Sequence, residues 1–260
     1  MSQVSNAPAT AGSSARSGTA PLIEVKNVSR AFKLGSEDVY AVKNVSMTIQ
    51  RQSFVTLVGR SGSGKTTLLN LLAGLDHPSE GQILFDGKDM ATLSEKEVIQ
   101  MRRNRIGVVF QSFALLPLLS AYENVELPLR IAGLSAPERS QRTEEALEMV
   151  GLTRRAKHRP FELSGGEQQR ISIARAVGIK PDIILADEPT GELDSANAGH
   201  IFGLFQEMSH ERGMTIVATT HDRTLLDMAD HIYEISDGVL AQRGAAGHDQ
   251  DALFKKPAGH

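Results

Sequence analysis

Residues 59–66 are the stretch whose chemistry follows most directly from residue types and spacing. They match G-x-x-x-x-G-K-[ST], the pattern of loops that bind nucleotide phosphates. The glycines let the backbone turn tightly, so that its N–H groups can surround a phosphate. Lys65 supplies a cation for the outer phosphates, and the Thr66 hydroxyl can ligate Mg²⁺. An ordinary glycine-rich turn is the alternative, but it does not explain the Lys-Thr pair at its end.

The flanking segments predict the strand–loop–helix context that this motif requires. Residues 54–58 are apolar and rich in β-branched side chains, which predicts a buried strand. Residues 67–73 are rich in Leu and lack Gly and Pro, which predicts a helix whose positive dipole end faces the phosphate. The expected nucleotide contacts of the loop are Gly59, Arg60, Ser61, Gly62, Ser63, Gly64, Lys65, Thr66 and Thr67.

Asp187 and Glu188 form a second group with catalytic potential. They close the apolar run 183–187, which predicts a buried strand. A carboxylate at such a strand end can hold Mg²⁺ through its water shell. Glu188, next to the terminal phosphate, could orient an attacking water or accept its proton. Many strands end in acids at a plain turn, but the phosphate loop in the same chain favours the functional interpretation.

Residues 163–170, Leu-Ser-Gly-Gly-Glu-Gln-Gln-Arg, predict a second anion site. The Ser164 hydroxyl and the free N–H groups of the helix that begins near Gly165 and Gly166 can bind a phosphate. One nucleotide does not need two such sites in one chain. We therefore expect this site to close on a nucleotide held by a second copy. The alternative is a Ser-capped helix with a Gly-Gly hinge.

The segments that position these residues predict an α/β fold: a phosphate-loop ATPase body with a mostly parallel sheet, an antiparallel β part near the N-terminus and a helical subdomain insertion. In such a sheet the chemistry lies at the carboxyl ends of the strands. Strands are expected at 22–32, 42–49, 54–58, 81–87, 106–110, 183–187, 214–219, 231–235 and 239–242, with a polar turn at 35–38. Helices are expected at 67–73, 94–103, 122–131, 137–150 and 195–211. The second of these opens with Ser94 and has Glu97 three residues on, which predicts a capping box.

Composition and length limit the classes of function. The chain has 260 residues and a net charge of −3, so no global basic field favours nucleic acid. It has no Cys, which excludes disulfides and Cys-based zinc sites, and its histidines lack metal-ligand spacing. No apolar run is long enough to span a membrane. We expect an ATPase domain at 21–243, with the helical insertion at about 112–165, and disordered tails at 1–20 and 244–260.

Together and in this order, the motifs resemble the nucleotide-binding subunit of an ATP-binding cassette (ABC) transporter, over about residues 22–242. The resemblance implies ATP and Mg²⁺ as cofactors. It implies that residues 163–170 are the ABC signature, that Asp187 holds the metal and that Glu188 is the catalytic base. Within the family, residues 110–117, 123–129 and 185–191 are most similar to the subgroup that drives lipoprotein release and macrolide export.

The resemblance also implies roles for residues that carry no signal alone. Tyr40 matches the aromatic that stacks on adenine, and Gln111 the glutamine that senses Mg²⁺ and faces the membrane partner. Asp194, with Leu193, matches the loop that crosses the dimer, and His221 the histidine that contacts the terminal phosphate. Alone, Tyr40 would be a half-buried strand aromatic, Gln111 a loop amide and His221 a structural histidine. The implied metal contacts are Thr66, Gln111 and Asp187, and the implied catalytic residues are Glu188, His221 and Gln111.

The same resemblance implies a peripheral protein at the cytoplasmic face of the inner membrane. Its partners would be a second copy of itself and integral-membrane permease subunits, with no nucleic acid. The residues at 191–192, Gly-Glu, depart from the Ser-Ala or Gly-Asn of many relatives. One alternative is the ATPase of a non-transport complex that regulates a cell-envelope hydrolase. A soluble cassette for DNA repair or translation usually has a coiled-coil insertion or two cassettes, and a kinase would leave residues 163–170 unexplained.

Overall fold

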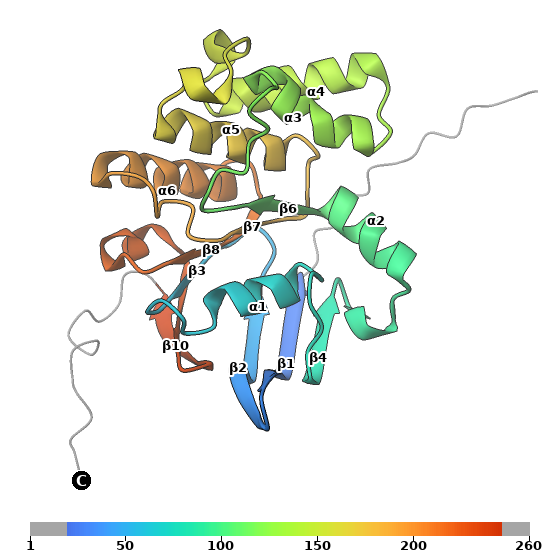
Figure 1. The fold of residues 1–260 in the computed structure, drawn as a ribbon, viewed down its shortest axis with the longest axis vertical. Coiled ribbons are helices and arrows are strands. Elements are labelled where there is room, and N and C mark those ends of the chain that lie inside the picture. The colour runs from blue at the N-terminus through green and yellow to red at the C-terminus, as the bar shows by residue number, and fades with distance from the viewer. Residues whose placement is uncertain (1–19, 246–260) are drawn as a thin grey trace, which may run out of the picture.

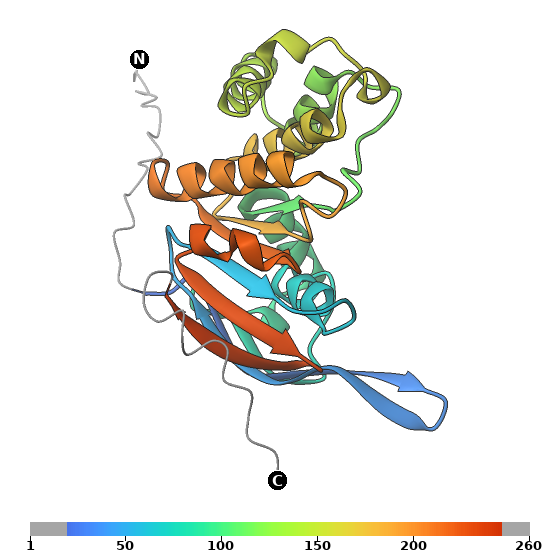
Figure 2. The ribbon, with the colours of Figure 1, turned by 90° about the vertical axis from the view of Figure 1, so that its left-hand side faces the viewer.

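The computed structural model describes residues 20–245. The expected tails therefore lie outside the described residues, except at positions 20, 244 and 245, the last two of which belong to a strand. Within the described part of the chain, no helix has both the length and the apolar character that crossing a bilayer requires. The elements form two sheets with helices above and between them (Figures 1 and 2).

The N-terminal half contributes an antiparallel sheet, as expected, in the order β2-β1-β4-β5. Its strands are β1 (Ile23–Leu34), β2 (Glu37–Ile49), β4 (Glu80–Phe85) and β5 (Lys88–Asp89). The expected polar turn at 35–38 is too long. Asp38 pairs with Lys33 and Glu37 with Leu34, so only two residues remain in the turn, and the first, Gly35, has φ +66°. Cross-strand pairing extends both strands beyond the apolar pattern that predicted them.

The second sheet holds the phosphate loop and is mostly parallel, as expected, in the order β10-β9-β3-β8-β7-β6. Only β10 runs antiparallel to its neighbour, β9. The strands are β3 (Phe54–Val58), β6 (Ile106–Val109), β7 (Ile183–Ala186), β8 (Thr215–Thr220), β9 (His231–Ser236) and β10 (Val239–Ala245). The carboxyl ends of β3, β6, β7 and β8 therefore meet at one edge of this sheet.

The helices cover this sheet on both sides (Figure 1). They are α1 (Lys65–Leu72), α2 (Glu95–Arg105), α3 (Ala121–Ile131), α4 (Ala136–Met149), α5 (Gly165–Val177) and α6 (Ser195–His210). Short 3₁₀ segments are η1 (Met90–Thr92), η2 (Thr153–Arg155), η3 (Pro160–Glu162) and η4 (Arg223–Met228). The capping box expected at Ser94 is present, because its side chain and that of Glu97 each bond the other's backbone N–H. Helices α3 and α4 form an upper layer that packs on α5.

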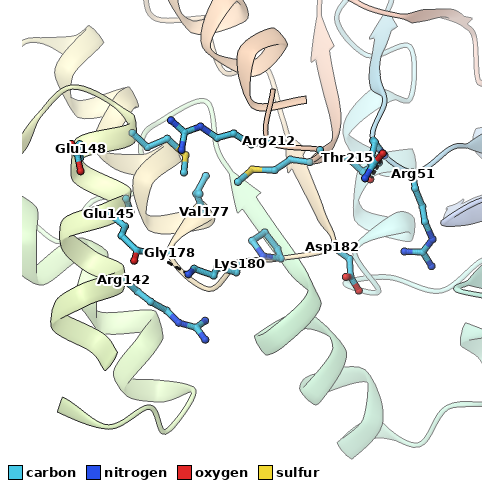
Figure 3. Close-up of a pocket in the computed structure, with 16 residues that line it drawn as sticks. Arg51, Arg142, Glu145, Glu148, Val177, Gly178, Lys180, Asp182, Arg212 and Thr215 are labelled. Atoms are coloured by element: carbon cyan, nitrogen blue, oxygen red, sulfur yellow. Dashed lines mark hydrogen bonds and ion pairs between the residues drawn. The ribbon is translucent and has the colours of Figure 1, made fainter. Parts of the chain in front are cut away.

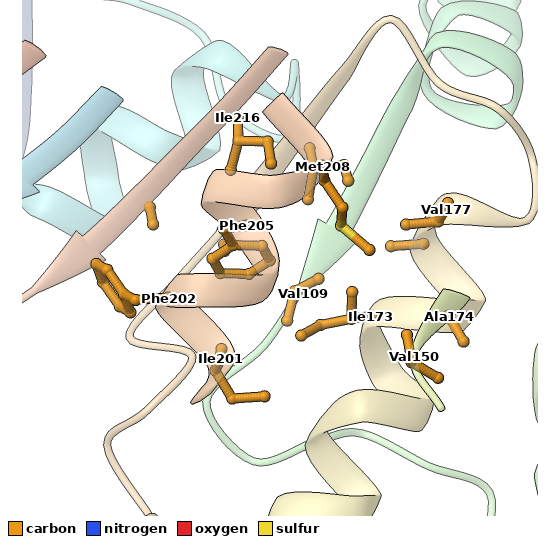
Figure 4. Close-up of a cluster of buried hydrophobic side chains, with 14 of the residues drawn as sticks. Val109, Val150, Ile173, Ala174, Val177, Ile201, Phe202, Phe205, Met208 and Ile216 are labelled. Carbon is orange, nitrogen blue, oxygen red and sulfur yellow. The ribbon is translucent and has the colours of Figure 1, made fainter. Parts of the chain in front are cut away.

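Strand β3 lies between two hydrophobic clusters. Phe54 and Val58 face the cluster under α5 and α6, while Val55 and Leu57 face the cluster formed by α1 and the antiparallel sheet. The Phe54 ring lies 5.7 Å from that of Phe202 and 6.0 Å from that of Phe205, in tilted and edge-on arrangements that favour aromatic pairs. Figure 4 shows this α6 face against α5 and β6. The strand that leads into the phosphate loop is thus fixed from both sides.

Candidate functional site

The phosphate loop connects the carboxyl end of β3 to the N-terminus of α1, which confirms the expected strand–loop–helix arrangement. Gly64 caps α1 with φ +107°, a backbone conformation that favours glycine. A Cβ atom at Gly64 would lie 2.1 Å from the carbonyl oxygen of Ala41, and one at Gly59 would lie 2.3 Å from that of Ile235. These two glycines therefore permit the close approach of the loop to β2 and β9.

Lys65 folds back over the loop with its side chain only 4 % exposed. Its Nζ donates hydrogen bonds to the carbonyl oxygens of Gly59 (2.9 Å) and Arg60 (3.0 Å). The Ser63 hydroxyl is buried and has no hydrogen-bond partner among residues 20–245. Of the other loop residues, Arg60, Ser61, Gly62 and Thr66 are exposed, and Thr67 is half-buried. The loop thus holds a cation, free N–H groups and an unsatisfied hydroxyl, which fits an anionic phosphate.

The acidic pair lies beside this loop. Glu188 places one carboxylate oxygen 3.1 Å from Lys65 Nζ and the other 3.2 Å from His221 Nδ1. Glu188 itself has φ +42°, an unusual backbone conformation for a residue with a side chain. The Thr219 hydroxyl donates to Asp187 Oδ1 at 2.9 Å and accepts from the Glu188 backbone N–H at 2.7 Å. One hydroxyl therefore holds both acids in place.

Thr219 is a site residue that the sequence interpretation missed. It stands in a run of β-branched residues that predicts only a strand. Once β7 and β8 are known to be neighbours, with Ala186 opposite Ala218, the next residues on each strand are Asp187 and Thr219. Strand pairing is the signal that finds it, and pairing cannot be read from one strand alone.

Gln111 and Tyr40 lie at the margins of the site. A Cβ atom at Gly191 would come within 2.9 Å of Gln111 Nε2, so the glutamine side chain lies over the turn that follows Glu188. Tyr40 is 42 % exposed on β2, and the neighbouring Ala41 carbonyl is the atom that approaches Gly64. Tyr40 therefore lies next to the residue that approaches the phosphate loop, and its exposed ring is accessible to a ligand.

A second group forms around residues 164–166. The Ser164 hydroxyl caps α5, accepting from Glu167 N–H at 3.3 Å, and the Glu167 carboxylate accepts from Ser164 N–H at 2.9 Å. The hydrogen bond from the Ser164 backbone N–H first, and the Ser164 side chain second, lower the pKa of the Glu167 carboxylate below its ordinary value. A Cβ atom at Gly165 would meet Leu193 at 3.5 Å, and one at Gly166 would meet Asn197 at 2.6 Å.

Asp194 belongs to this second group, because its carboxylate caps α6 by accepting from Asn197 N–H at 2.8 Å. Among the described residues, no recorded hydrogen bond or ion pair joins residues 164–166 to the loop 59–66. The structure therefore brings Lys65, Asp187, Glu188 and His221 together, with Gln111 beside them, and keeps the Ser164 group apart. One chain therefore presents two separate groups of residues that could each bind an anion.

The donor atoms at the first group suit a hard divalent cation. The Thr66 hydroxyl, the Gln111 amide oxygen and the Asp187 carboxylate are all oxygen ligands of the kind that Mg²⁺ prefers. Residues 20–245 contain no cluster of three His, Asp or Glu side chains poised to chelate a metal. An ion here would therefore rely on few protein ligands together with phosphate oxygens and water, as Mg²⁺ commonly does.

Comparison with known proteins adds independent support. A family model described as "ABC transporter" matches residues 42–191. The chain is 44 % identical over 223 residues to the ABC transporter ATP-binding protein YtrE of Bacillus subtilis, covering 84 % of this chain and 96 % of that one. It is 45 % identical over 223 residues to the macrolide export ATP-binding/permease protein MacB of Wolinella succinogenes, covering 86 % of this chain but 34 % of that protein.

Solved structures give the same result. The dimeric post-hydrolysis state of the ATP-binding cassette MJ0796, bound to ADP and Pi, superposes with a TM-score of 0.77 at 43 % identity. The match covers 85 % of this chain and 99 % of that one. The homologous sequence, from Methanocaldococcus jannaschii, is 45 % identical over 221 residues, covering 84 % of this chain and 94 % of that one.

Proposed function

This chain belongs to the ABC transporter family, and we propose that two copies of it bind two Mg·ATP between the phosphate loop of one copy and residues 164–166 of the other. The protein is the ATP-binding subunit of an ABC transporter and hydrolyses ATP to ADP and phosphate in support of transport. The composite site, the metal, the roles of individual residues and the membrane partner are our proposals.

The observation that carries the proposal is the separation of two anion-binding surfaces in one chain. Lys65 and the acidic pair lie together, whereas Ser164 and the two glycines after it pack against Leu193 and Asn197. Each surface is half of a phosphate pocket, and a twofold dimer would supply the missing half to both. The dimeric state reported for MJ0796 supports this arrangement.

In the proposed mechanism, Lys65 and the loop N–H groups bind the outer phosphates. Mg²⁺, when bound, would neutralise developing charge on the phosphate oxygens. Thr66, Asp187 and Gln111 would hold it. Glu188 accepts a proton from, or orients, the attacking water, because its carboxylate lies beside both Lys65 and His221. Tyr40 offers an exposed ring for the adenine.

The membrane partner has a candidate surface of its own. A cavity of about 330 Å³ opens between α2, α3 and α5, with a mostly apolar lining that includes Leu116, Leu127 and Ile131. Leu116 lies five residues after Gln111, so the loop that leaves the margin of the ATP site ends at this groove. We assign it to a segment of a membrane permease. We place the protein as a peripheral subunit on the cytoplasmic face of the inner membrane, held there by that partner.

The resemblance of the sequence to exporters and lipoprotein-release systems makes an export-type permease our choice. MacB carries ATP-binding and permease functions in one protein by name, and this chain matches about a third of it. No comparison favours the alternative of a regulator of a cell-envelope hydrolase.

The replacement Glu188→Gln tests the proposal. It keeps the shape of the side chain but removes the base, so ATP binding should persist while turnover is lost. Light scattering after size exclusion should then show an ATP-dependent dimer that the wild type forms only transiently. Hydrolysis at the wild-type rate would show that Glu188 is not the base, and a monomer with bound ATP would contradict the composite site.

A further inference from the structure

A sizeable cavity lies far from this chemistry. It has a volume of about 670 Å³ and opens at the amino ends of the parallel strands, the edge opposite the phosphate loop. One wall is α4 and the other is the sheet edge, with the end of α5 between them (Figure 3). The function proposed above makes no use of this cavity.

Charged side chains of both signs line each wall, and apolar atoms lie between the walls. Asp182, paired with Arg105, lies on the sheet side, and Arg142, paired with Glu138, lies on α4. On the sheet side stand Arg51 and Arg212, the latter with its nearest recorded carboxylate, Glu207, 3.9 Å away. Arg51 is itself paired with Asp86. Figure 3 shows Arg212 reaching across the cavity toward α4. On the α4 side stand Glu145, paired with Lys180, and Glu148, which is exposed and has no recorded ion pair among residues 20–245. Apolar atoms between the walls come from Ala146, Met149, Val177, Pro181 and Met214.

The described chain ends at the same edge of the sheet. Ala245 of β10 pairs with His231 of β9, and His231 pairs with Val55 near the start of β3. From β10 to β8, which begins at the cavity, the sheet order crosses β9 and β3. These three strand spacings amount to about 14 Å. Leu253 lies eight residues beyond Ala245, and an extended chain of that length spans about 26 Å. The C-terminal segment can therefore reach the cavity.

The sequence of that segment complements the cavity lining in kind. Asp249 and Asp251 come first, the apolar pair Leu253-Phe254 follows, and Lys255-Lys256 comes last. The acids can pair with Arg212, which lies 3.9 Å from its own carboxylate partner, and the lysines can pair with Glu148, while the apolar pair between them can cover the apolar atoms of the lining. By contrast, residues 1–19 contain no pair of adjacent large apolar side chains.

We propose that residues 249–256 of this chain occupy the cavity between α4 and the amino edge of the parallel sheet, with Leu253 and Phe254 in its apolar part. The bound segment ties the α3–α4 layer to the sheet. Any effect on turnover rests on the proposed function, because closure of the dimer would require that layer to move. The binding itself can be tested without ATP.

Disulfide trapping in the full-length protein is the test. Because the sequence has no Cys, only the introduced thiols can form a crosslink. Met149→Cys places a thiol on the cavity wall, and Ala252→Cys places one beside the apolar pair. Mild oxidation should give an intramolecular crosslink, identified by the mass of the joined tryptic peptides. Adding Leu253→Asp and Phe254→Asp should abolish that product, since carboxylates would not enter the apolar space.

The matched control moves the first thiol to Phe161→Cys, an exposed position just before the Ser164 group. Equal trapping at that position, or trapping that survives the two Asp substitutions, would mean random encounter and would overturn the proposal. So would a crosslink found only between two chains, which would make the occupant a second copy.

The rate of alkylation is a second measurement. Iodoacetamide should alkylate the thiol of Met149→Cys more slowly when the C-terminal segment is wild type than when it carries Leu253→Asp and Phe254→Asp. Equal rates would overturn the proposal.

Discussion

Lys65 and Glu188 form an ion pair in which Nζ and Oε1 lie 3.1 Å apart, with side chains only 4 % and 19 % exposed. The pair joins the helix after β3 to the turn after β7, two elements far apart in the sequence. In this arrangement the carboxylate lies beside the cation that a phosphate would use. An incoming phosphate must therefore compete with Glu188 for Lys65.

Replacing Lys65 tests that relationship directly. Lys65→Met should abolish nucleotide binding, measured by isothermal titration, because the loop loses its only buried cation among the described residues. The free energy of unfolding should fall by about 1–3 kcal/mol, since the Gly59 and Arg60 carbonyls lose a donor. Lys33→Met, at an exposed position of β1, is the control and should change neither quantity.

Gly64→Ala should distort the phosphate loop. Its Cβ atom would lie 2.1 Å from the Ala41 carbonyl oxygen, at a backbone φ of +107°. We expect loss of ATP binding and a clear drop in the urea midpoint followed by circular dichroism. Gly62→Ala is the matched control, because Gly62 also has positive φ but nothing lies within 4 Å of the added atom. There only the backbone strain remains, about 1–3 kcal/mol. Equal effects of the two substitutions would argue against a steric role for Gly64.

Thr219→Val should loosen the acidic pair while keeping the shape of the side chain. The half-buried Asp187 carboxylate and the Glu188 N–H would each lose a partner, which should lower the free energy of unfolding by about 1–3 kcal/mol. A rate loss of about tenfold corresponds to about 1.4 kcal/mol of barrier, and we expect at least that in kcat. Thr219→Ser should restore most activity. Thr220→Val, whose hydroxyl contacts Asp222 instead, should leave kcat near wild type.

The Ser164–Glu167 cap predicts a defined pH dependence. Because hydrogen bonds from Ser164 lower the pKa of Glu167, the folded state binds this proton less tightly than the unfolded state. The stabilisation is therefore complete above the ordinary Glu pKa of about 4.3 and is lost as the pH falls through the lowered value. The difference in urea midpoint between wild type and Glu167→Gln should be largest near pH 7 and shrink in acid. A difference in urea midpoint that stays constant from pH 7 into acid would contradict this interpretation of the cap.

Local sequence was enough to predict the elements whose signal is contained in one segment. The loop 59–66 sits between a strand and a helix, and the Ser94 capping box begins α2, because both patterns depend on neighbouring residues. The mostly parallel sheet followed from the alternation of strand and helix patterns. Helix α1 begins at Lys65, two residues before the Leu-rich run 67–73 that indicated it, and Gly64 rather than a polar side chain caps it.

What the sequence did not reveal depends on contacts between segments. Segment η4 and the short strand β5 have no apolar period of their own, so they were not expected. Thr219 acquires its role only through the pairing of β8 with β7. The positive φ of Glu188 arises where the chain turns after β7 toward the phosphate loop, and no residue type in the sequence predicts it. The roles of Gln111, Tyr40, Asp194 and His221 came from the family resemblance and remain predictions.

The burial of β3 on both faces has a consequence for the order in which the molecule opens. Its amide hydrogens are covered by two hydrophobic clusters and bonded to β8 and β9, so they exchange with solvent only when the whole domain unfolds. The loop that β3 carries is anchored at one end to the most protected segment. The phosphate loop therefore keeps its ligand-binding conformation during local fluctuations that open the outer elements of the domain.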